Sequence, residues 1–211
     1  MKETRVSFLS GQLLLDGILG IPRGFAPFPA VIVCHPHPLY GGSMDNNVVN
    51  GLFEALTQAS CASLKFNFRG VGGSQGEFGQ GTGEQADVEA AISFVSKLDE
   101  VDPQRIGLAG YSAGAGFALP VGSDDARIKA LAAISLPLDM FDFEFLKNCP
   151  KPKCLIMGDK DDLISAQELL EFCGSLPEPK ECETIVGADH FWWGYESQLA
   201  ARVIAFFGKA L

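Results

Sequence analysis

Short runs of apolar residues divide the chain into a series of predicted β-strands. Residues 30–34, Ala-Val-Ile-Val-Cys, are continuously apolar, which is typical of a strand buried on both faces of a sheet. Residues 6–9 and 13–21 predict two opening strands joined at Ser10-Gly11. Further runs predict strands at residues 63–68, 105–109, 128–136, 153–157 and 181–186. The pattern therefore predicts about eight short strands.

Between these strands, apolar residues recur at helical spacing. In residues 84–98, Val88, Ala91, Ile92 and Val95 form one apolar stripe. Helices are also predicted at residues 45–58 (capped by Asp45 or Asn46), from Ser112 onward, at 166–176 and at 196–209. Strands that alternate with helices predict an α/β fold, with a mostly parallel sheet covered on both faces. In such a sheet, ligands bind beyond the carboxyl ends of the strands.

Length, composition and charge narrow the class of protein. The chain has 211 residues, of which 47% are hydrophobic and 20% charged, which predicts a single domain over residues 1–211. A net charge of −10 argues against a nucleic acid partner, because phosphate backbones are bound through Lys and Arg clusters. No stretch is long and apolar enough to span a membrane, and the N-terminal residues do not resemble a secretory leader. We therefore expect a cytoplasmic protein.

The cysteines and histidines show no spacing typical of a metal site. There are six cysteines but no Cys-x-x-Cys pair, and only three histidines, so we expect no metal and no cofactor. Most of the cysteines have apolar neighbours, as buried free thiols do. Cys149 and Cys154 could pair in an oxidising compartment, but for a cytoplasmic protein we expect reduced thiols.

The strongest chemical signal is the segment Gly110-Tyr111-Ser112-Ala113-Gly114, which matches G-x-S-x-G. It lies between a predicted strand and a predicted helix, which is the context that this motif requires. The serine must sit on a tight turn, and side chains at the two glycine positions would collide with that turn. The N-terminus of the following helix favours developing negative charge. These features favour Ser112 as a nucleophile over an unreactive serine in a glycine-rich turn.

This arrangement resembles the nucleophile turn of α/β-hydrolases, which implies a triad in the chain order Ser, acid, His. His190 is the only histidine that follows Ser112, and it comes directly after the last predicted strand. In α/β-hydrolases the acid often stands in a G-x-x-D pattern followed by apolar residues, which favours Asp161 after Gly158. Asp159 and Asp162 are alternatives in the same loop, and Asp139 and Asp142 follow the preceding strand.

An acyl-transfer site also needs two backbone donors for the oxyanion. One is expected to be the N–H of Ala113, and the other comes from residues 35–42, His-Pro-His-Pro-Leu-Tyr-Gly-Gly. This loop resembles the H-G-x-P loop of α/β-hydrolases, which implies that the second donor is the N–H of His37. The alternative donors are Leu39 and Tyr40, because proline has no N–H. His35 is expected to be structural and to bond within the loop.

Two segments extend the resemblance over nearly the whole chain. Residues 35–42 and residues 67–76, Asn-Phe-Arg-Gly-Val-Gly-Gly-Ser-Gln-Gly, look like those of small bacterial α/β-hydrolases related to dienelactone hydrolase. Dienelactone hydrolase uses a cysteine nucleophile, and this chain has Ser112, so that activity does not carry over. We expect Arg69 to brace its loop through Glu84 or Asp87.

The predicted site has little to cover it. Only about sixteen residues separate Leu136 from Lys153, where larger relatives insert a lid, and residues 140–146 are expected to form a short helix over the cleft. Tyr40, Leu39 and Trp192 are candidates to line a substrate pocket.

These features together predict a carboxylesterase-like serine hydrolase that cleaves small acyl esters or thioesters through an acyl-enzyme. Its partner would be a small-molecule ester substrate, and an exposed apolar edge could support a homodimer. The alternatives are a peptidase, a lactone hydrolase or a carbon–carbon bond hydrolase on the same triad, or a non-catalytic ligand-binding member of the fold.

Overall fold

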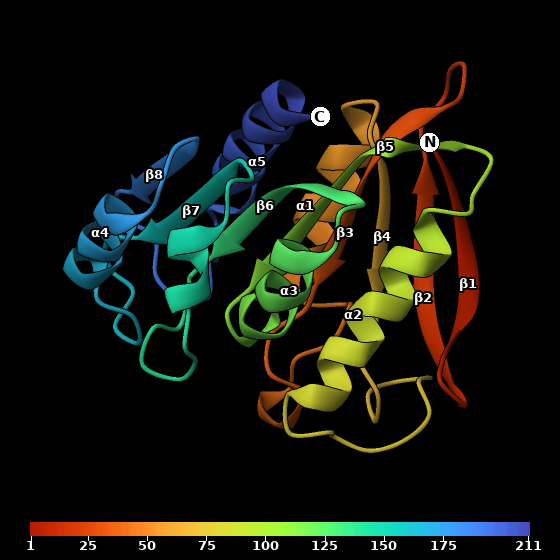
Figure 1. Cartoon of the computed structure of the whole chain (residues 1–211), viewed down its shortest axis with the longest axis horizontal. Helices are drawn as coiled ribbons and strands as arrows, with labels where there is room; N and C mark the ends of the chain where they lie inside the picture. The colour runs from red at the N-terminus through yellow and green to blue at the C-terminus, as the bar shows by residue number, and fades with distance from the viewer.

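An eight-stranded sheet with the order β1-β2-β4-β3-β5-β6-β7-β8 runs through the computed structural model, which describes all 211 residues (Figure 1). The strands are β1 (Lys2–Ser10), β2 (Leu13–Ile21), β3 (Phe28–Cys34), β4 (Ala62–Phe66), β5 (Val101–Tyr111), β6 (Ile128–Ile134), β7 (Lys153–Gly158) and β8 (Lys180–Ile185). β2 pairs antiparallel with β1 and with β4, and every other pairing is parallel. The predicted mostly parallel sheet is confirmed.

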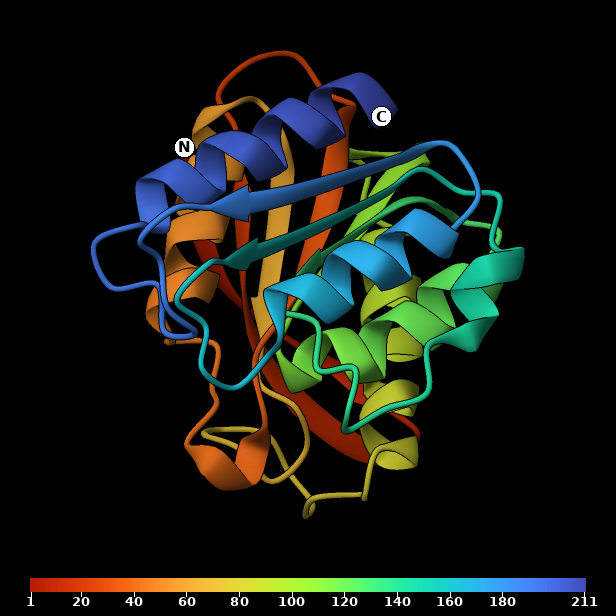
Figure 2. The same ribbon diagram turned by 90° about the vertical axis from the view of Figure 1, so that its left-hand side faces the viewer.

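Helices cover both faces of this sheet, as Figures 1 and 2 show. Helices α1 (Asn47–Gln58) and α5 (Glu196–Ala210) lie on one face. Helices α2 (Thr82–Val95), α3 (Ala113–Asp124) and α4 (Ala166–Ser175) lie on the other. Two short 3-10 helices, η1 (Pro38–Tyr40) and η2 (Glu144–Asn148), belong to the connections. No helix combines the length and the apolar character that a membrane crossing requires.

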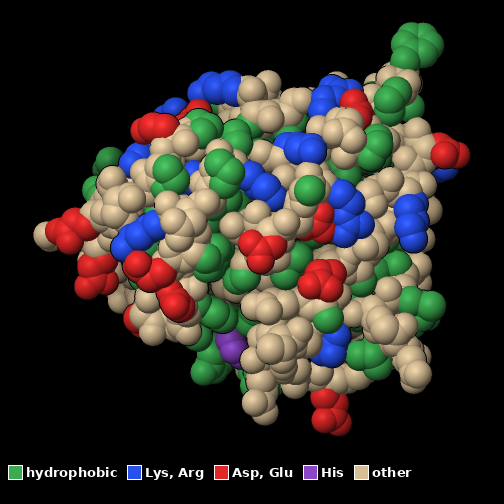
Figure 3. All heavy atoms as spheres, viewed as in Figure 1, with side chains coloured by type: hydrophobic (Ala, Val, Ile, Leu, Met, Phe, Trp, Pro, Cys, Tyr) green, Lys and Arg blue, Asp and Glu red, His purple; other side chains and the backbone are tan.

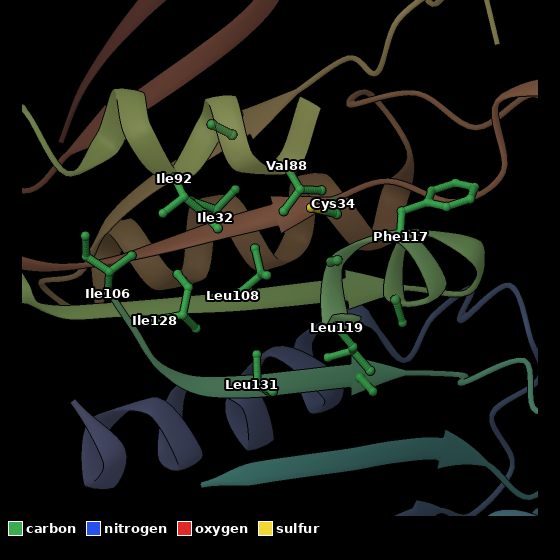
Figure 4. Close-up of a cluster of buried hydrophobic side chains, with 14 of the residues drawn as sticks. Ile32, Cys34, Val88, Ile92, Ile106, Leu108, Phe117, Leu119, Ile128 and Leu131 are labelled. Carbon is green, nitrogen blue, oxygen red and sulfur yellow. The ribbon is translucent and has the colours of Figure 1, made fainter. Parts of the chain in front are cut away.

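The central strands are buried on both faces because their apolar residues alternate between two hydrophobic layers. Ile32, Ile106 and Leu108 point toward α2 and α3, where they pack with Val88 (Figure 4). The alternate residues, such as Val33, pack under α1 and α5. Each fully buried aliphatic side chain contributes about 1.5–3 kcal/mol. This packing holds β3 and β5 rigidly side by side, and both strands end at the same edge of the sheet.

The glycine-rich loop after β4 is braced by a buried ion pair. The Arg69 guanidinium donates to both oxygens of Asp87, with the shortest distance 2.7 Å, and the Asp87 side chain is completely buried. Glu84 instead accepts from the backbone N–H groups of Gly79 and Gly81 at the start of α2. Arg69 therefore braces the loop as expected, with Asp87 as its partner.

One expectation about the cysteines is wrong. Cys173 of α4 and Cys182 of β8 form a disulfide, and their Cα atoms are 6.4 Å apart. No motif or spacing predicts this pair, because the pairing depends on α4 packing beside β8. The other four cysteines are free and buried, as their apolar neighbours indicated: Cys34, Cys61, Cys149 and Cys154.

The connection after β6 also differs from the prediction. The expected helix at residues 140–146 is replaced by η2, which begins later, at Glu144. The shift has a local cause, because the Asp142 carboxylate accepts from the Glu144 N–H and starts the turn there. Phe143 and Leu146 are buried in the core, so this segment packs down onto the domain, and Met140 is left exposed. The connection is consistent with a minimal lid.

Candidate active site

The predicted nucleophile stands on a strained turn between β5 and α3. Ser112 has φ 53° and ψ −127°, a conformation that non-glycine residues rarely adopt. A Cβ at Gly110 would lie 2.4 Å from the Ala115 Cα, and one at Gly114 would lie 2.4 Å from the His35 carbonyl oxygen. Both glycines are therefore required by close backbone packing. The G-x-S-x-G motif predicted this, since side chains at these two positions would collide with the turn.

Ser112, His190 and Asp161 form a continuous chain of hydrogen bonds. His190 Nε2 lies 3.2 Å from Ser112 Oγ, and His190 Nδ1 lies 2.9 Å from Asp161 Oδ2. Because an ionised carboxylate can only accept, Nδ1 carries the imidazole proton and Nε2 is free to accept from the serine hydroxyl. The Asp161 side chain is fully buried, and its Oδ1 accepts from the N–H groups of Leu163 and Ile164.

The alternative aspartates lie in other environments. Asp159 accepts from the N–H of Gly187 at 2.6 Å, and Asp142 begins η2. Asp162 is exposed, and Asp139 is exposed where it lines the cavity described below. None of the four hydrogen-bonds to His190. The geometry therefore singles out Asp161, which the G-x-x-D pattern favoured.

The segment that carries His190 is fixed by hydrogen bonds on both sides. The Tyr111 hydroxyl donates to the His190 carbonyl at 2.6 Å, and burial raises the pKa of Tyr111, which keeps it a donor. Asp189 accepts from the N–H groups of Phe191 and Trp192. Sequence reasoning missed Tyr111, because it occupies the variable second position of G-x-S-x-G and only the fold brings it to His190.

Two of the predicted pocket residues are not part of the pocket. Trp192 is wrong as a substrate contact: its side chain is completely buried against α5 and β6, and its indole N–H donates to Ser135 Oγ at 3.2 Å. Leu39 is exposed but does not line the cavity, because η1 turns its side chain outward. Tyr40, the third candidate, does line the cavity.

Of the three candidate oxyanion donors in the loop after β3, only the His37 N–H has no partner. Leu39 N–H donates to His37 Nδ1 at 3.1 Å, and Tyr40 N–H donates to the His37 carbonyl at 3.1 Å. The two alternative oxyanion donors are thus engaged within the loop. His37 N–H makes no hydrogen bond, and Ala113 is the first residue of α3, where helix amides lack intrahelical acceptors. Both of these residues line the cavity beside Ser112.

His35 has the structural position that the sequence predicted. Its Nδ1 lies 2.7 Å from the Pro36 carbonyl and its Nε2 accepts from the Phe68 N–H at 3.0 Å. Both nitrogens are therefore used, with the proton on Nδ1. Burial of the ring lowers the pKa of His35 to about 4. The side chain links the loop after β3 to the segment after β4 as a neutral imidazole.

A cavity of about 570 Å³ opens over Ser112 and His190. Apolar side chains at its mouth are exposed to solvent: Tyr40, Met140, Leu163 and Phe191. Figure 3 shows a histidine side chain bordered by hydrophobic side chains at the lower edge of the molecule. No group of three or more His, Cys, Asp or Glu side chains is arranged to hold a metal ion. The site brings together a hydroxyl, an imidazole, a buried carboxylate and free backbone amides.

Comparison with known proteins agrees with the fold described above. A family model described as an alpha/beta hydrolase domain matches residues 30–198. The chain belongs to the α/β-hydrolase family. An uncharacterized protein of Rickettsia prowazekii, RP471, is 36% identical over 172 residues, which cover 78% of this chain and 72% of the relative.

Solved structures of similar α/β-hydrolases superpose over almost the whole chain. An alpha-beta serine hydrolase homologue from Coxiella burnetii has a TM-score of 0.88 and 30% identity, with 97% of each chain covered. XC6422 from Xanthomonas campestris, an a/b serine hydrolase without lid, has a TM-score of 0.87 and 28% identity. It covers all of this chain, and 96% of its own length is matched. The minimal lid is therefore a feature that this α/β-hydrolase shares with a similar structure.

The buried His35 predicts how stability depends on pH. An unfolded histidine titrates near pH ~6.5. The folded pKa of about 4 means that the unfolded chain binds this proton first as the pH falls. Stability should therefore decrease by about 3 kcal/mol between pH ~6.5 and ~4, with no contribution from His35 above that range. The measurement is urea unfolding at several pH values for the natural chain and for His35→Gln, whose amide oxygen can still accept from Phe68. Identical slopes for the two proteins would contradict this assignment.

Removing the Tyr111 hydroxyl should destabilise the segment that carries His190. Tyr111→Phe leaves the His190 carbonyl without its buried donor, so we expect a loss of about 1–2 kcal/mol in urea unfolding. Tyr195→Phe is the matched control, because the Tyr195 hydroxyl makes no hydrogen bond within the protein and lies on the same segment. Equal losses in the two variants would show that the hydrogen bond from Tyr111 is unimportant.

Proposed function

We propose that this protein is a carboxylesterase-like serine hydrolase that cleaves small acyl esters or thioesters. The observation that carries the proposal is the hydrogen-bonded chain from Ser112 through His190 to the buried Asp161, which opens onto a largely apolar cavity. A non-catalytic member of the fold has no need to keep all three groups within hydrogen-bonding distance of one another. The complete chain of contacts therefore supports an enzyme over a ligand-binding protein.

In the first half of the reaction, His190 Nε2 takes the proton from Ser112 as Oγ attacks the carbonyl carbon of the ester. Asp161 holds the imidazole in the correct tautomer and stabilises the imidazolium that forms. The carbonyl oxygen becomes an oxyanion and accepts from the N–H groups of His37 and Ala113. These amides need no rearrangement to do so, which is the source of their effect on the barrier.

In the second half, the intermediate collapses and the bond to the leaving oxygen or sulfur breaks. The imidazolium of His190 gives its proton to that leaving group, and the acyl group stays on Ser112 Oγ. A water molecule then gives a proton to His190 as its oxygen attacks the acyl carbon. The bond from that carbon to Ser112 Oγ breaks, His190 returns the proton to Oγ, and the carboxylic acid is released. The short connection between β6 and β7 leaves the cavity open to small esters and to this water.

Replacing the nucleophile should abolish turnover. For Ser112→Ala we expect kcat on p-nitrophenyl butyrate to fall by about 10⁴-fold or more, together with loss of labelling by a fluorophosphonate probe. Ser197→Ala, an exposed serine on α5, is the control and should behave as the natural chain does. Unchanged turnover in Ser112→Ala would exclude the mechanism. A panel of peptides, lactones and carbon–carbon substrates would show whether another reaction of the same triad is preferred.

The imidazole of His37 should act as a positioning group for the oxyanion loop. Burial lowers the pKa of His37, which favours the neutral ring whose Nδ1 accepts from Leu39 N–H. His37→Leu keeps the apolar packing against Tyr40 but removes this acceptor, so we expect kcat to fall about tenfold with a smaller change in KM.

His37→Asn is the matched variant, because an asparagine side chain also accepts from the N–H two residues on. It should retain kcat within about threefold of the natural chain. Equal losses in His37→Leu and His37→Asn would show that the ring matters for another reason.

The cytoplasmic location and the homodimer stay predictions, to be tested by cell fractionation and analytical ultracentrifugation.

A further inference from the structure

The cavity over Ser112 has an acidic side chain in its lining but no Lys or Arg. Apart from the imidazoles of His37 and His190, the only charged residue that lines the cavity is Asp139. Asp139 is exposed and has no ion-pair or hydrogen-bond partner within the chain. The buried Asp161 adds a second negative charge behind His190. A substrate thus enters a region whose fixed charges are all negative.

The apolar residues at the mouth of the cavity also favour cationic and neutral groups over anionic ones. Tyr40 and Phe191 line the cavity with their rings largely exposed, at 82% and 55%. Aromatic faces attract organic cations and provide apolar contact area for neutral groups. Met140, next to Asp139 in the chain, is a flexible apolar side chain that is 53% exposed. This lining contains no Lys or Arg side chain that could form an ion pair with a carboxylate or phosphate on the substrate.

The negative charge that develops during the reaction increases the repulsion of an anionic substrate. The oxyanion that forms during attack is already a negative charge near Ser112. A second negative charge on the substrate would lie in the same cavity as Asp139, with no cation to offset the repulsion. A positive charge in that place would be attracted to the carboxylate. The net charge of −10 acts in the same direction on the approach of the substrate.

We propose that this site, if it is the esterase site proposed above, selects apolar esters that carry a positive charge or none. Esters and thioesters that carry a carboxylate or phosphate group are poor substrates. Asp139 is the residue that sets this order. Thioesters of phosphate-bearing carriers are thereby excluded as substrates. Small apolar esters are favoured, and among them the esters that carry an amine are preferred.

The test uses esters matched in backbone length whose terminal group is cationic, neutral or anionic. On the acyl side these are the p-nitrophenyl esters of 4-(trimethylammonio)butanoate, of pentanoate and of glutarate. On the alcohol side they are the butyrate esters of choline, of 3,3-dimethylbutanol and of 3-hydroxypropanoate. In at least one series we expect kcat/KM to fall in the order cationic, neutral, anionic, with about tenfold between the ends at low salt. The difference should shrink at high ionic strength.

Asp139→Asn should reduce the ratio of cationic to anionic kcat/KM several-fold, mainly through KM. Asp99→Asn is the matched control, because it makes the same change in net charge at the opposite edge of the sheet, before β5. Its ratios should equal those of the natural chain. A ratio near one in both series, or a preference for the anionic ester, would overturn the proposal, as would equal effects of Asp139→Asn and Asp99→Asn.

A binding measurement separates this inference from the proposed function. The anilides corresponding to the three acyl groups are titrated calorimetrically into Ser112→Ala and into Ser112→Ala/Asp139→Asn, so that no turnover is needed. Tighter binding of the cationic anilide that is lost with Asp139 supports the charge preference, even if no ester is hydrolysed and the esterase function fails. Equal binding of the three anilides would refute the preference while leaving ester hydrolysis at Ser112 intact.

Discussion

The strained backbone at Ser112 is the constraint on which the rest of the site depends. A positive φ at a serine costs about 1–3 kcal/mol, so the conformation persists only where surrounding packing imposes it. Here the Ser112 N–H donates to the Ile134 carbonyl at 2.8 Å, and Gly114 lies directly against the backbone of His35. The nucleophile is thus fixed to β6 on one side and to the loop after β3 on the other. These backbone contacts therefore hold Ser112 and the free His37 N–H in fixed positions relative to each other.

The loops after β7 and β8 are held together in a similar way. Gly158 approaches the Ala188 carbonyl so closely that a Cβ would lie 2.0 Å from its oxygen, and the Lys160 N–H donates to that same carbonyl. This backbone contact brings Asp161 beside His190, although 29 positions separate them. Side-chain hydrogen bonds at the site therefore follow from backbone contacts between neighbouring loops, and these contacts follow from the parallel order of the strands.

Much of this could be predicted from sequence because the signals were local. Buried runs fixed the strands, Asn46 was named as one of two caps for α1, and G-x-S-x-G required the turn at Ser112. Other features depend on contacts between distant segments. Trp192 has a positive φ and turns inward to meet Ser135, so an aromatic residue beside His190 is buried rather than exposed. The disulfide between α4 and β8 has the same origin, since no spacing rule pairs Cys173 with Cys182.

The aspartates near the site show why environment, rather than pattern, decides a role. Asp159 and Asp161 stand two residues apart in one loop, yet Asp159 ties the loop to Gly187 while Asp161 is buried with three donors around it. Those donors supply the hydrogen bonds without which a buried carboxylate would be too costly. Asp139 has no such donors and stays in water at the edge of the cavity. Its charge is unneutralised by any neighbour, so it remains available to act on whatever enters the cavity.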